Sequence, residues 1–257
     1  MRTEPYIPPP SALLALTEAH RTFVEIISLR LGRSVLSRAP EGDGHPVMVL
    51  PGFMGGDGYN GPLRRYLTKR NYEVHGWGLG RNLGPREGVL EQMQERLVFL
   101  SEQHGQAVSL VGHSLGGIFA RELARELPQH VRQVISLGSP FGEGRLTASY
   151  LAGLFSRLNP PEELPIDQGV LATAPPVPTT AIYSHGDGVV NWKTSVQSEE
   201  GSHAKTESIR IIGSHCGMTM NPTAWFLLAE RLAQHPDDWL PFERQGWSSV
   251  FYPSAVN

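Results

Sequence analysis

Three residues whose side chains could act together on a carbonyl carbon each occupy a glycine-flanked turn of this sequence. Ser114 is the middle residue of Gly-His-Ser-Leu-Gly at 112–116. Asp187 lies between two glycines, and His215 is the middle residue of Gly-Ser-His-Cys-Gly. A serine hydroxyl is a poor nucleophile until a base takes its proton, and the base needs an anion that holds its tautomer and stabilises its charged form. The three residue types therefore match the needs of nucleophilic catalysis.

The segment around Ser114 predicts a strand, a sharp turn and a helix. Residues 107–111 are apolar and rich in β-branched side chains, which is typical of a buried strand, and residues 118–127 have helical spacing. In that context Gly-x-Ser-x-Gly indicates a nucleophile elbow, in which strained backbone lifts the serine hydroxyl above the sheet edge. A side chain at Gly112 or Gly116 would collide with the neighbouring strand or helix. The alternative is a glycine-rich turn that only packs.

The candidate acid and base follow two later strands. Residues 179–183 and 209–212 each predict a strand, and Asp187 and His215 lie in the loops that leave them. Strands that alternate with helices form a parallel sheet, and its functional loops gather at the carboxyl ends of the strands. We therefore expect both residues to lie near Ser114.

Other residues compete for these roles, since the chain has ten histidines. His185 is close to Asp187 and is the alternative base, whereas His203 precedes its strand and should lie at the opposite end of the sheet. His113 directly precedes the candidate nucleophile and is expected to point away from it. Glu143 follows the strand after the elbow and is the alternative to Asp187.

A developing oxyanion needs two preorganised hydrogen-bond donors. The backbone N–H of Leu115, directly after the candidate nucleophile, is one. The other should come from the glycine-rich loop after the strand at 46–51, where Phe53 is the first choice and Met54 the second. The same loop could be taken for a phosphate-binding loop. The chain has no Gly-Lys-Ser/Thr sequence and no acid at the spacing expected for ribose, so that interpretation is weak.

The composition is that of an ordinary globular protein with ample core. Hydrophobic residues make up 40% of the chain and charged residues 18%, and the formal net charge is −3 at pH 7. That charge favours neither nucleic acid nor an anionic membrane as a partner. The single cysteine, Cys216, excludes an internal disulfide and a metal site built from several thiolates.

Residues 11–31 are the only candidate targeting segment. Ser11 is a suitable helix N-cap and Gly32 a suitable stop. Glu18 and His20 interrupt the apolar residues, so the segment predicts an amphipathic helix rather than a signal peptide. No apolar run approaches the roughly 18 residues of a membrane span. We therefore expect no transmembrane segment and a cytoplasmic location.

The length fits one large domain and no linker divides it, so residues 1–257 are expected to form a single α/β domain. Its sheet should be mostly parallel, with about six strands and with helices on both faces. The remaining elements are expected as strands at 46–51, 72–77 and 131–137 and helices at 61–70, 87–103 and 222–232.

Residues 141–178 break the alternation of strands and helices. They carry a helical pattern at 146–158 followed by a stretch crowded with prolines. A long irregular insertion between two strands is commonly functional, and we expect a cap that lines an acyl pocket. The expected substrate-contacting residues are Met54, Leu151, Leu154 and Phe155. In the alternative the insertion packs on the sheet as core, and the acyl pocket lies around Trp77.

With these motifs the chain resembles the lipase/esterase branch of the α/β-hydrolases over roughly residues 45–235. The residues around Ser114 match the elbow of the family, Asp187 its acid loop and His215 its base loop. Within the branch the chain looks similar to bacterial triacylglycerol-lipase-like esterases. It has Pro-Gly at 51–52 where many members have His-Gly, and the leading antiparallel hairpin of the family is expected to be absent.

The residues and the resemblance together imply hydrolysis of a small-molecule carboxylic ester through an acyl-serine intermediate, without a cofactor or a metal. Ser114 would attack, His215 would relay the proton and Asp187 would orient His215. The amides of Leu115 and Phe53 would hold the oxyanion. The same residues could serve an acyltransferase or a thioesterase, and a binding protein on a hydrolase scaffold is a third alternative. The sequence indicates no oligomeric state.

Overall fold

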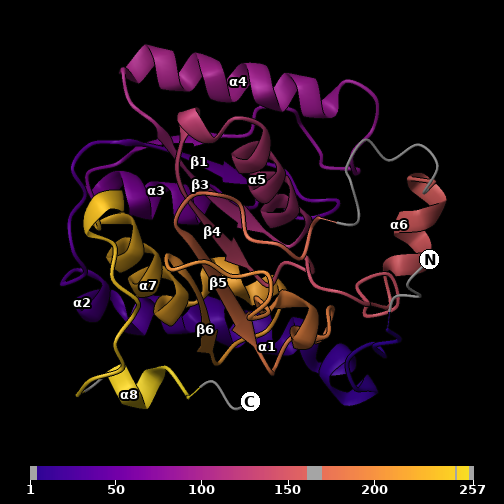
Figure 1. Ribbon diagram of the computed structural model, residues 1–257. Coiled ribbons are helices and arrows are strands. Elements are labelled where there is room, and N and C mark those ends of the chain that lie inside the picture. Colours follow the sequence, from indigo (N-terminus) through magenta and orange to yellow (C-terminus); the bar gives the residue numbers. More distant parts are fainter. Residues whose placement is uncertain (1–4, 161–169, 247, 255–257) are drawn as a thin grey trace.

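A parallel sheet forms the centre of the molecule (Figure 1). The computed structural model describes residues 5–160, 170–246 and 248–254. Within these residues the strands are β1 (Pro46–Leu50), β2 (Glu73–Gly76), β3 (Val108–His113), β4 (Val131–Leu137), β5 (Thr179–Ser184) and β6 (Thr206–Ile211). Their order is β2-β1-β3-β4-β5-β6, and every neighbouring pair is parallel. The expected sheet of about six strands is confirmed.

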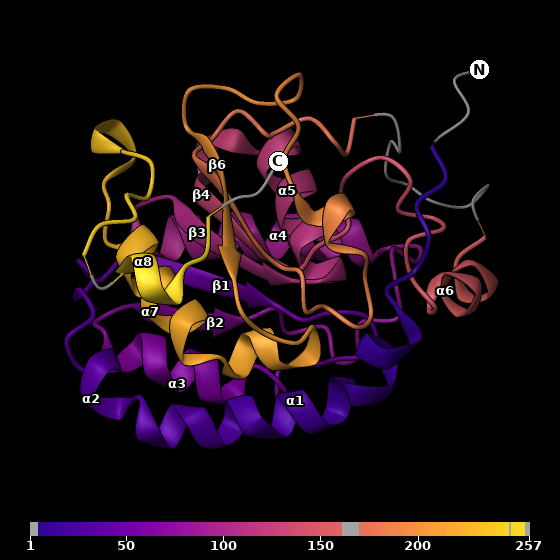
Figure 2. The same cartoon turned by 90° about the horizontal axis from the view of Figure 1, so that it is seen from below.

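Helices cover both faces of the sheet (Figures 1 and 2). On one face lie α1 (Ala12–Leu31), α2 (Arg33–Leu36), α3 (Gly61–Lys69), α7 (Pro222–Leu232) and α8 (Ser248–Phe251), and on the other lie α4 (Val89–His104) and α5 (Leu115–Glu126). The short α6 (Ala152–Leu158) stands at the edge of the molecule. Because all the strands are parallel, their carboxyl ends lie at one edge of the sheet, where loops can meet.

Strand β1 illustrates how the core is divided. Val47 and Val49 pack with side chains of α3 and α7, whereas Met48 and Leu50 pack with those of α4 and α5. All four are buried, because successive side chains of a strand point to opposite faces and both faces carry helices.

Helix α1 begins and ends where the sequence predicts. The Ser11 side chain accepts a hydrogen bond from the Leu14 amide, and Gly32 caps the other end. Helix α7 likewise starts at its proline, as expected for the first position of a helix. In the described part of the chain, no helix combines the length and the apolar character that crossing a bilayer requires.

The helix expected at 146–158 is shorter in the structure, where α6 covers Ala152–Leu158. Ser149 instead forms an isolated antiparallel bridge with Val190. Because this contact with a distant segment holds the backbone in an extended pairing, the residues before α6 do not continue the helix. Residues 161–169 of the expected cap lie outside the described residues.

Candidate active site

Ser114 occupies a strained turn between β3 and α5. Its φ is 52° and its ψ −121°, a combination that residues with a side chain rarely adopt. Its amide donates a hydrogen bond to the carbonyl oxygen of Leu137 in β4, 2.8 Å away. The neighbouring strand thus helps to hold the serine in the unusual conformation expected of an elbow.

Two glycines leave the room that this turn needs. A Cβ atom at Gly112 would lie 2.3 Å from the carbonyl oxygen of Gly116, and one at Gly116 would lie 2.4 Å from that of Leu50. Both obstacles are backbone atoms, which cannot swing aside as a flexible side chain could. A side chain at either position would therefore collide with the helix or with the neighbouring strand, as the sequence predicts.

The backbone around Ser114 offers two candidate donors for an oxyanion. Leu115 is the first residue of α5, so its amide has no acceptor inside the helix. Phe53 lines the same cleft as Ser114 and Leu115. Among the described residues, no backbone hydrogen bond uses the Phe53 amide, whereas the Met54 amide donates to the carbonyl oxygen of Asn82, 2.6 Å away. Of the two residues expected in this role, Phe53 is therefore the available donor.

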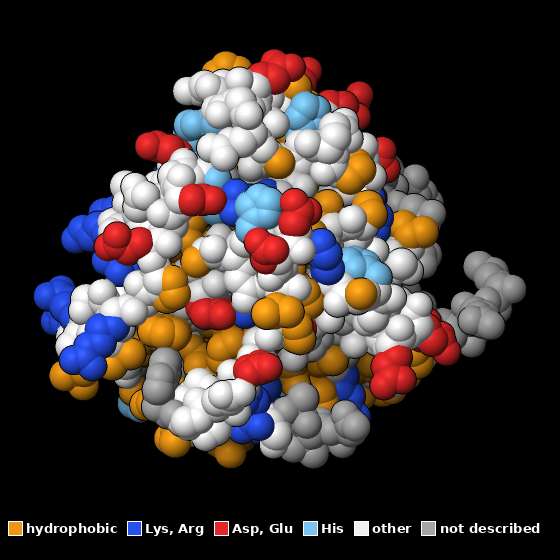
Figure 3. Space-filling view, turned by 60° about the vertical axis from the view of Figure 1, so that its left-hand side comes forward, with side chains coloured by type: hydrophobic (Ala, Val, Ile, Leu, Met, Phe, Trp, Pro, Cys, Tyr) orange, Lys and Arg blue, Asp and Glu red, His pale blue; other side chains and the backbone are white. Residues whose placement is uncertain are grey.

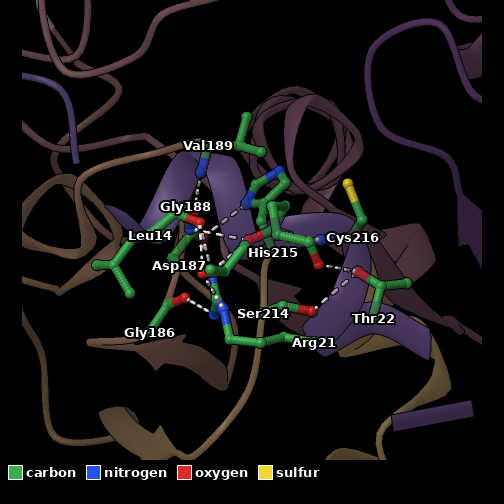
Figure 4. Close-up of polar contacts among 12 residues, drawn as sticks. Leu14, Arg21, Thr22, Gly186, Asp187, Gly188, Val189, Ser214, His215 and Cys216 are labelled. Atoms are coloured by element: carbon green, nitrogen blue, oxygen red, sulfur yellow. Dashed lines mark hydrogen bonds and ion pairs between the residues drawn. The ribbon is translucent and has the colours of Figure 1, made fainter. Parts of the chain in front are cut away.

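Asp187 and His215 contact each other although they follow different strands (Figure 4). Nδ1 of His215 lies 2.6 Å from Oδ2 of Asp187. The other carboxylate oxygen, Oδ1, accepts hydrogen bonds from the amides of Val189 and Val190 at 2.9 and 2.7 Å. Both side chains are buried. Because Nδ1 donates its proton to the carboxylate, the neutral ring has its acceptor at Nε2.

The carboxylate also favours the protonated form of His215. Burial alone lowers the pKa of His215, but the charge and the hydrogen bond of Asp187 outweigh burial and raise the pKa above the usual histidine value. Among the hydrogen bonds of the described residues, none joins the Ser114 hydroxyl to His215. In free enzymes such catalytic hydrogen bonds are often long and tighten only when substrate binds.

His113 supports His215, which the sequence does not reveal. Its Nε2 lies 3.0 Å from the His215 carbonyl oxygen, and the two rings are 5.0 Å apart between centroids. Burial lowers the pKa of His113 to about 3, so the ring is neutral and donates through Nε2. The side chain was expected only to point away from the serine, and it lies against the candidate base.

The competing residues lie elsewhere. The ring of His185 stacks on Trp192 with 4.0 Å between centroids rather than contacting Asp187. His203 lies three residues before β6 and its Nε2 contacts the Pro175 carbonyl oxygen, which agrees with the expected opposite end of the sheet. Glu143 is exposed.

A buried carboxylate from α1 joins the loops of the acid and the base. Glu18 accepts hydrogen bonds from the Cys216 amide through Oε1 at 2.7 Å and from the Gly188 amide through Oε2 at 3.1 Å. Arg21 lies 3.0 Å from Oε2 of Glu18 and also donates to the carbonyl oxygen of Gly186. Figure 4 shows these loops meeting at the helix. Helix α1 thereby fixes the position of the acid loop relative to the base loop.

Glu25, a second carboxylate of α1, also accepts a hydrogen bond from the loop of the candidate base. Its Oε1 accepts the Ser214 amide at 2.5 Å, while Oε2 is buried without a hydrogen-bond partner. Burial raises the pKa of Glu25 to about 7. Glu18 and Glu25 are 25 − 18 = 7 residues apart and so share one face of the helix. Two carboxylates at this spacing, the only acidic residues of a helix rich in apolar side chains, are the signal from which the sequence could have identified them.

An apolar cleft opens beside Ser114. Its empty volume is about 830 Å³ including the open mouth, and its walls include Leu115 and Ile118 of α5 and Phe155 of α6. Such a size and lining suit a small organic molecule. Within residues 5–160, 170–246 and 248–254, no group of three or more His, Cys, Asp or Glu side chains could hold a metal ion.

The structure places some of the expected substrate-contacting residues in this cleft and others away from it. Leu151 and Phe155 line it. Met54 and Leu154 are not among its lining residues and are 49% and 42% exposed. Trp77 is buried in the core with side chains of α4 and does not line this cleft.

Comparison with known proteins found similarities over part of the chain. The alpha/beta hydrolase fold family matches residues 88–161, which include the elbow. Over 98 residues the chain is 32% identical to RutD of Azorhizobium caulinodans, a proposed carbamate hydrolase. That match covers 36% of this chain and 37% of RutD, so the chain matches little more than a third of this relative.

Solved structures match over a longer stretch at lower identity. Lipase B of Aspergillus fumigatus is similar over 75% of this chain and 53% of the lipase, with 18% identity and a TM-score of 0.57. A thioesterase domain from the curacin biosynthetic pathway is similar over 76% of this chain and 93% of the domain, with 13% identity and a TM-score of 0.53. At these identities the likeness concerns the fold. The fold expected from the sequence is confirmed, and the chain has the α/β-hydrolase fold.

Proposed function

We propose that the chain hydrolyses carboxylic esters through an acyl intermediate on Ser114. The observation that carries this proposal is the buried contact between Asp187 and His215, in loops at the same sheet edge as the elbow of Ser114. A histidine whose Nδ1 is held by a carboxylate is arranged to take a proton at Nε2. The α/β-hydrolase fold is compatible with this reaction, although the fold is shared by a lipase and a thioesterase domain and does not by itself select the substrate.

In the first half of the reaction, Oγ of Ser114 attacks the ester carbonyl carbon while Nε2 of His215 takes the hydroxyl proton. The new carbon–oxygen bond displaces the carbonyl π electrons onto the oxygen, which becomes an oxyanion. The amides of Leu115 and Phe53 donate hydrogen bonds to it. The Asp187 carboxylate stabilises the charged ring of His215 during this step.

In the second half the intermediate collapses. The bond from the carbonyl carbon to the alkoxy oxygen breaks, and His215 returns its proton to the leaving alcohol. Water then attacks the acyl-serine with His215 again acting as base, which releases the carboxylic acid and restores Ser114. No further group is needed to balance the reaction.

The apolar cleft supports an acyl chain as the part of the substrate beyond the ester. Ile118, Leu151 and Phe155 line it beside Ser114, and the ring of Phe53 packs edge-on against that of Phe155 with 5.4 Å between centroids. In this proposal residues 141–178 act as a cap of a single domain, with α6 forming one wall of the acyl site.

A series of p-nitrophenyl esters from acetate to palmitate tests the proposal on the unmodified chain and on Ser114→Ala. The matched control is Ser156→Ala, because Ser156 is another serine on the cleft wall. Ester turnover should be lost in Ser114→Ala and kept in Ser156→Ala.

The substrate class is tested in parallel with thioester and carbamate analogues. If Ser114 is required for turnover of a thioester or carbamate but no ester is turned over, Ser114 remains the nucleophile and the proposal that the substrate is an ester is refuted. Ester turnover that survives in Ser114→Ala would refute the nucleophile itself.

A further inference from the structure

Helix α1 turns its carboxylates toward the protein and exposes most of its large apolar side chains. Its two carboxylates, Glu18 and Glu25, are buried. The outward side carries large apolar side chains: Leu16 is 84% exposed, Phe23 60% and Leu31 80%. A helix on the surface of a globular protein ordinarily has the opposite orientation, with its apolar stripe against the core. Packing in the core therefore does not explain why these apolar residues are present on α1.

These outward side chains follow one side of the helix, with the exposed His20 and Arg30 among them. We call the exposed large apolar residues of α1 the apolar ridge. They are Leu13, Leu16, Phe23, Val24, Ile26, Ile27 and Leu31. They extend over the whole length of the helix, and α1 forms one outer edge of the molecule (Figure 2). Exposed apolar surface of this kind marks an interaction site.

A cationic groove adjoins the ridge near the end of α1. Its empty volume is about 1430 Å³ including the open mouth, and its floor includes Leu36, Tyr66 and Trp225. The cations around it are Arg30, Arg33, Arg65, Lys69 and Arg70. Ile26 and Arg30 belong both to the outward side of α1 and to the wall of the groove, so ridge and groove form one surface.

Four of the five groove cations have no ion-pair partner among the described residues. The only acids of α1 are the buried Glu18 and Glu25, and neither α2 nor α3 contains an acid. Among the ion pairs of the described residues, Arg70 alone of the five groove cations takes part, with Glu41 at 3.7 Å. Figure 3 shows Lys and Arg side chains gathered along the left edge of the side that bears α2 and α3. The overall net charge of −3 conceals this local excess of positive charge.

The apolar ridge and the cationic groove together favour one kind of binding partner over another. A second copy of this chain, joined across a twofold axis at the groove, would bring the same cations together and so would be repelled. An apolar ridge on a helix at an outer edge, flanked by cations, has the properties of helices that lie in a lipid interface. The apolar side chains would enter the boundary between headgroups and acyl chains, and the cations would contact anionic headgroups.

We propose that the apolar ridge of α1 and the adjoining cationic groove dock this protein on the surface of a bilayer that contains anionic lipids. The contact is peripheral, with α1 lying in the plane of the interface. It is independent of the proposed ester hydrolysis, since it uses neither Ser114 nor His215.

Vesicle sedimentation tests the docking with two lipid compositions: phosphatidylcholine alone, and phosphatidylcholine with about 30% phosphatidylserine. The unmodified chain should sediment with the second and not with the first. Raising the salt to about 0.5 M should weaken binding, because the Debye length then falls well below 10 Å. No sedimentation with phosphatidylserine vesicles, or equal sedimentation with both, would overturn the proposal.

Matched variants assign the binding to this surface. Phe23→Gln removes part of the ridge, and the double change Arg33→Glu with Lys69→Glu reverses charges of the groove. Each should lower the partition coefficient about tenfold or more. The controls are Phe99→Gln on α4, at an equally exposed phenylalanine, and Arg86→Glu in the loop before α4. An equal loss in the controls would contradict the assignment.

Two further measurements separate the alternatives. Circular dichroism and thermal unfolding check that the variants fold, which is expected because the changed side chains are exposed. Sedimentation velocity without lipid should give the same species for the unmodified chain and for Phe23→Gln. A dimer that dissociates in Phe23→Gln would show instead that the ridge joins two copies of the chain, and the bilayer would be refuted as its occupant.

Discussion

Oε1 of Glu18 accepts a hydrogen bond from the amide of Cys216 at 2.7 Å, across a separation of 198 residues in the sequence. The contact ties the first helix of the chain to the loop of the candidate base. Helix α1, which is far from Ser114 in the sequence, therefore helps to position His215. The predictions below test the candidate site from the nucleophile outward.

A fluorophosphonate should add once to the chain, at Ser114, because the strained turn exposes its hydroxyl to the cleft and His215 can take its proton. Intact-protein mass spectrometry should show one adduct, and peptide mapping should place it at residue 114. Ser114→Ala should show none, while Ser156→Ala should label normally. An adduct on another serine would contradict the assignment of the nucleophile.

Asp187→Asn should lower kcat by about 10³–10⁴ with little change in KM, since the lost interaction belongs mainly to the transition state. The control is Glu143→Gln, at the exposed competing acid. If Glu143→Gln lost activity and Asp187→Asn kept it, the acid would have to be reassigned.

The pH dependence of kcat/KM tests the interaction between His215 and Asp187. Activity should rise with pH as His215 loses its proton, with a midpoint above the usual histidine value, because Asp187 raises the pKa of His215. In Asp187→Asn the carboxylate charge is gone, so the midpoint of the residual activity should move down. An unchanged midpoint would show that another group titrates.

Glu18→Gln and Glu18→Ala should lower kcat in increasing order, up to about 10–100-fold, because the amides of Cys216 and Gly188 lose their shared acceptor and the two loops shift. Both variants should also lower the midpoint of the pH profile, since the charge of Glu18 contributes to the raised pKa of His215. Glu102→Gln on the exposed side of α4 is the control. Reduced stability with an unchanged pH midpoint would mean that Glu18 has a structural role only.

Glu25→Gln should change how stability depends on pH. The unfolded carboxyl loses its proton near pH 4.5, whereas the folded one keeps it to about pH 7. Between these values the folded state binds more protons than the unfolded state, so the free energy of unfolding falls as pH rises. The full loss, on the order of 3 kcal/mol, is present above pH 7 and absent from the glutamine variant. Denaturant unfolding at pH 5 and pH 8 measures it, and an identical pH dependence of both proteins would refute the raised pKa.

Phe155→Ala and Leu151→Ala should change the preferred acyl-chain length, because both side chains line the cleft. Each apolar contact contributes about 1–3 kcal/mol of discrimination, so the ratio of kcat/KM between long and short esters should shift by tens-fold. Leu154→Ala is the matched control from the same helix, since Leu154 does not line the cleft. A loss of thermal stability without a change in this ratio would show that α6 is only packing.

Local patterns were sufficient for much of the fold. The periodicity of β3 and α5, the glycines at 112 and 116, the cap at Ser11 and the proline that opens α7 each act within a few residues, so the sequence predicts these elements where the structure has them. The same holds for the loops of Asp187 and His215, because parallel topology brings the carboxyl ends of strands together.

Where an element's residues are held by distant segments, the sequence was less informative. The helical pattern before Ala152 is not realised, because Ser149 pairs with Val190 instead. The Met54 amide, a possible oxyanion donor by position, is taken by Asn82, a residue of another loop. Such competition between partners cannot be judged from local spacing.

The sequence by itself determined that residues 12–31 form a helix, and only the tertiary structure decided which side of it faces inward. The loops of the acid and the base present buried amides at Gly188, Ser214 and Cys216. Buried amides without acceptors are costly, so the carboxylates of α1 turn toward them. The side of α1 that carries these carboxylates must face the loops, so most of its large apolar side chains, which lie on the opposite side, are exposed.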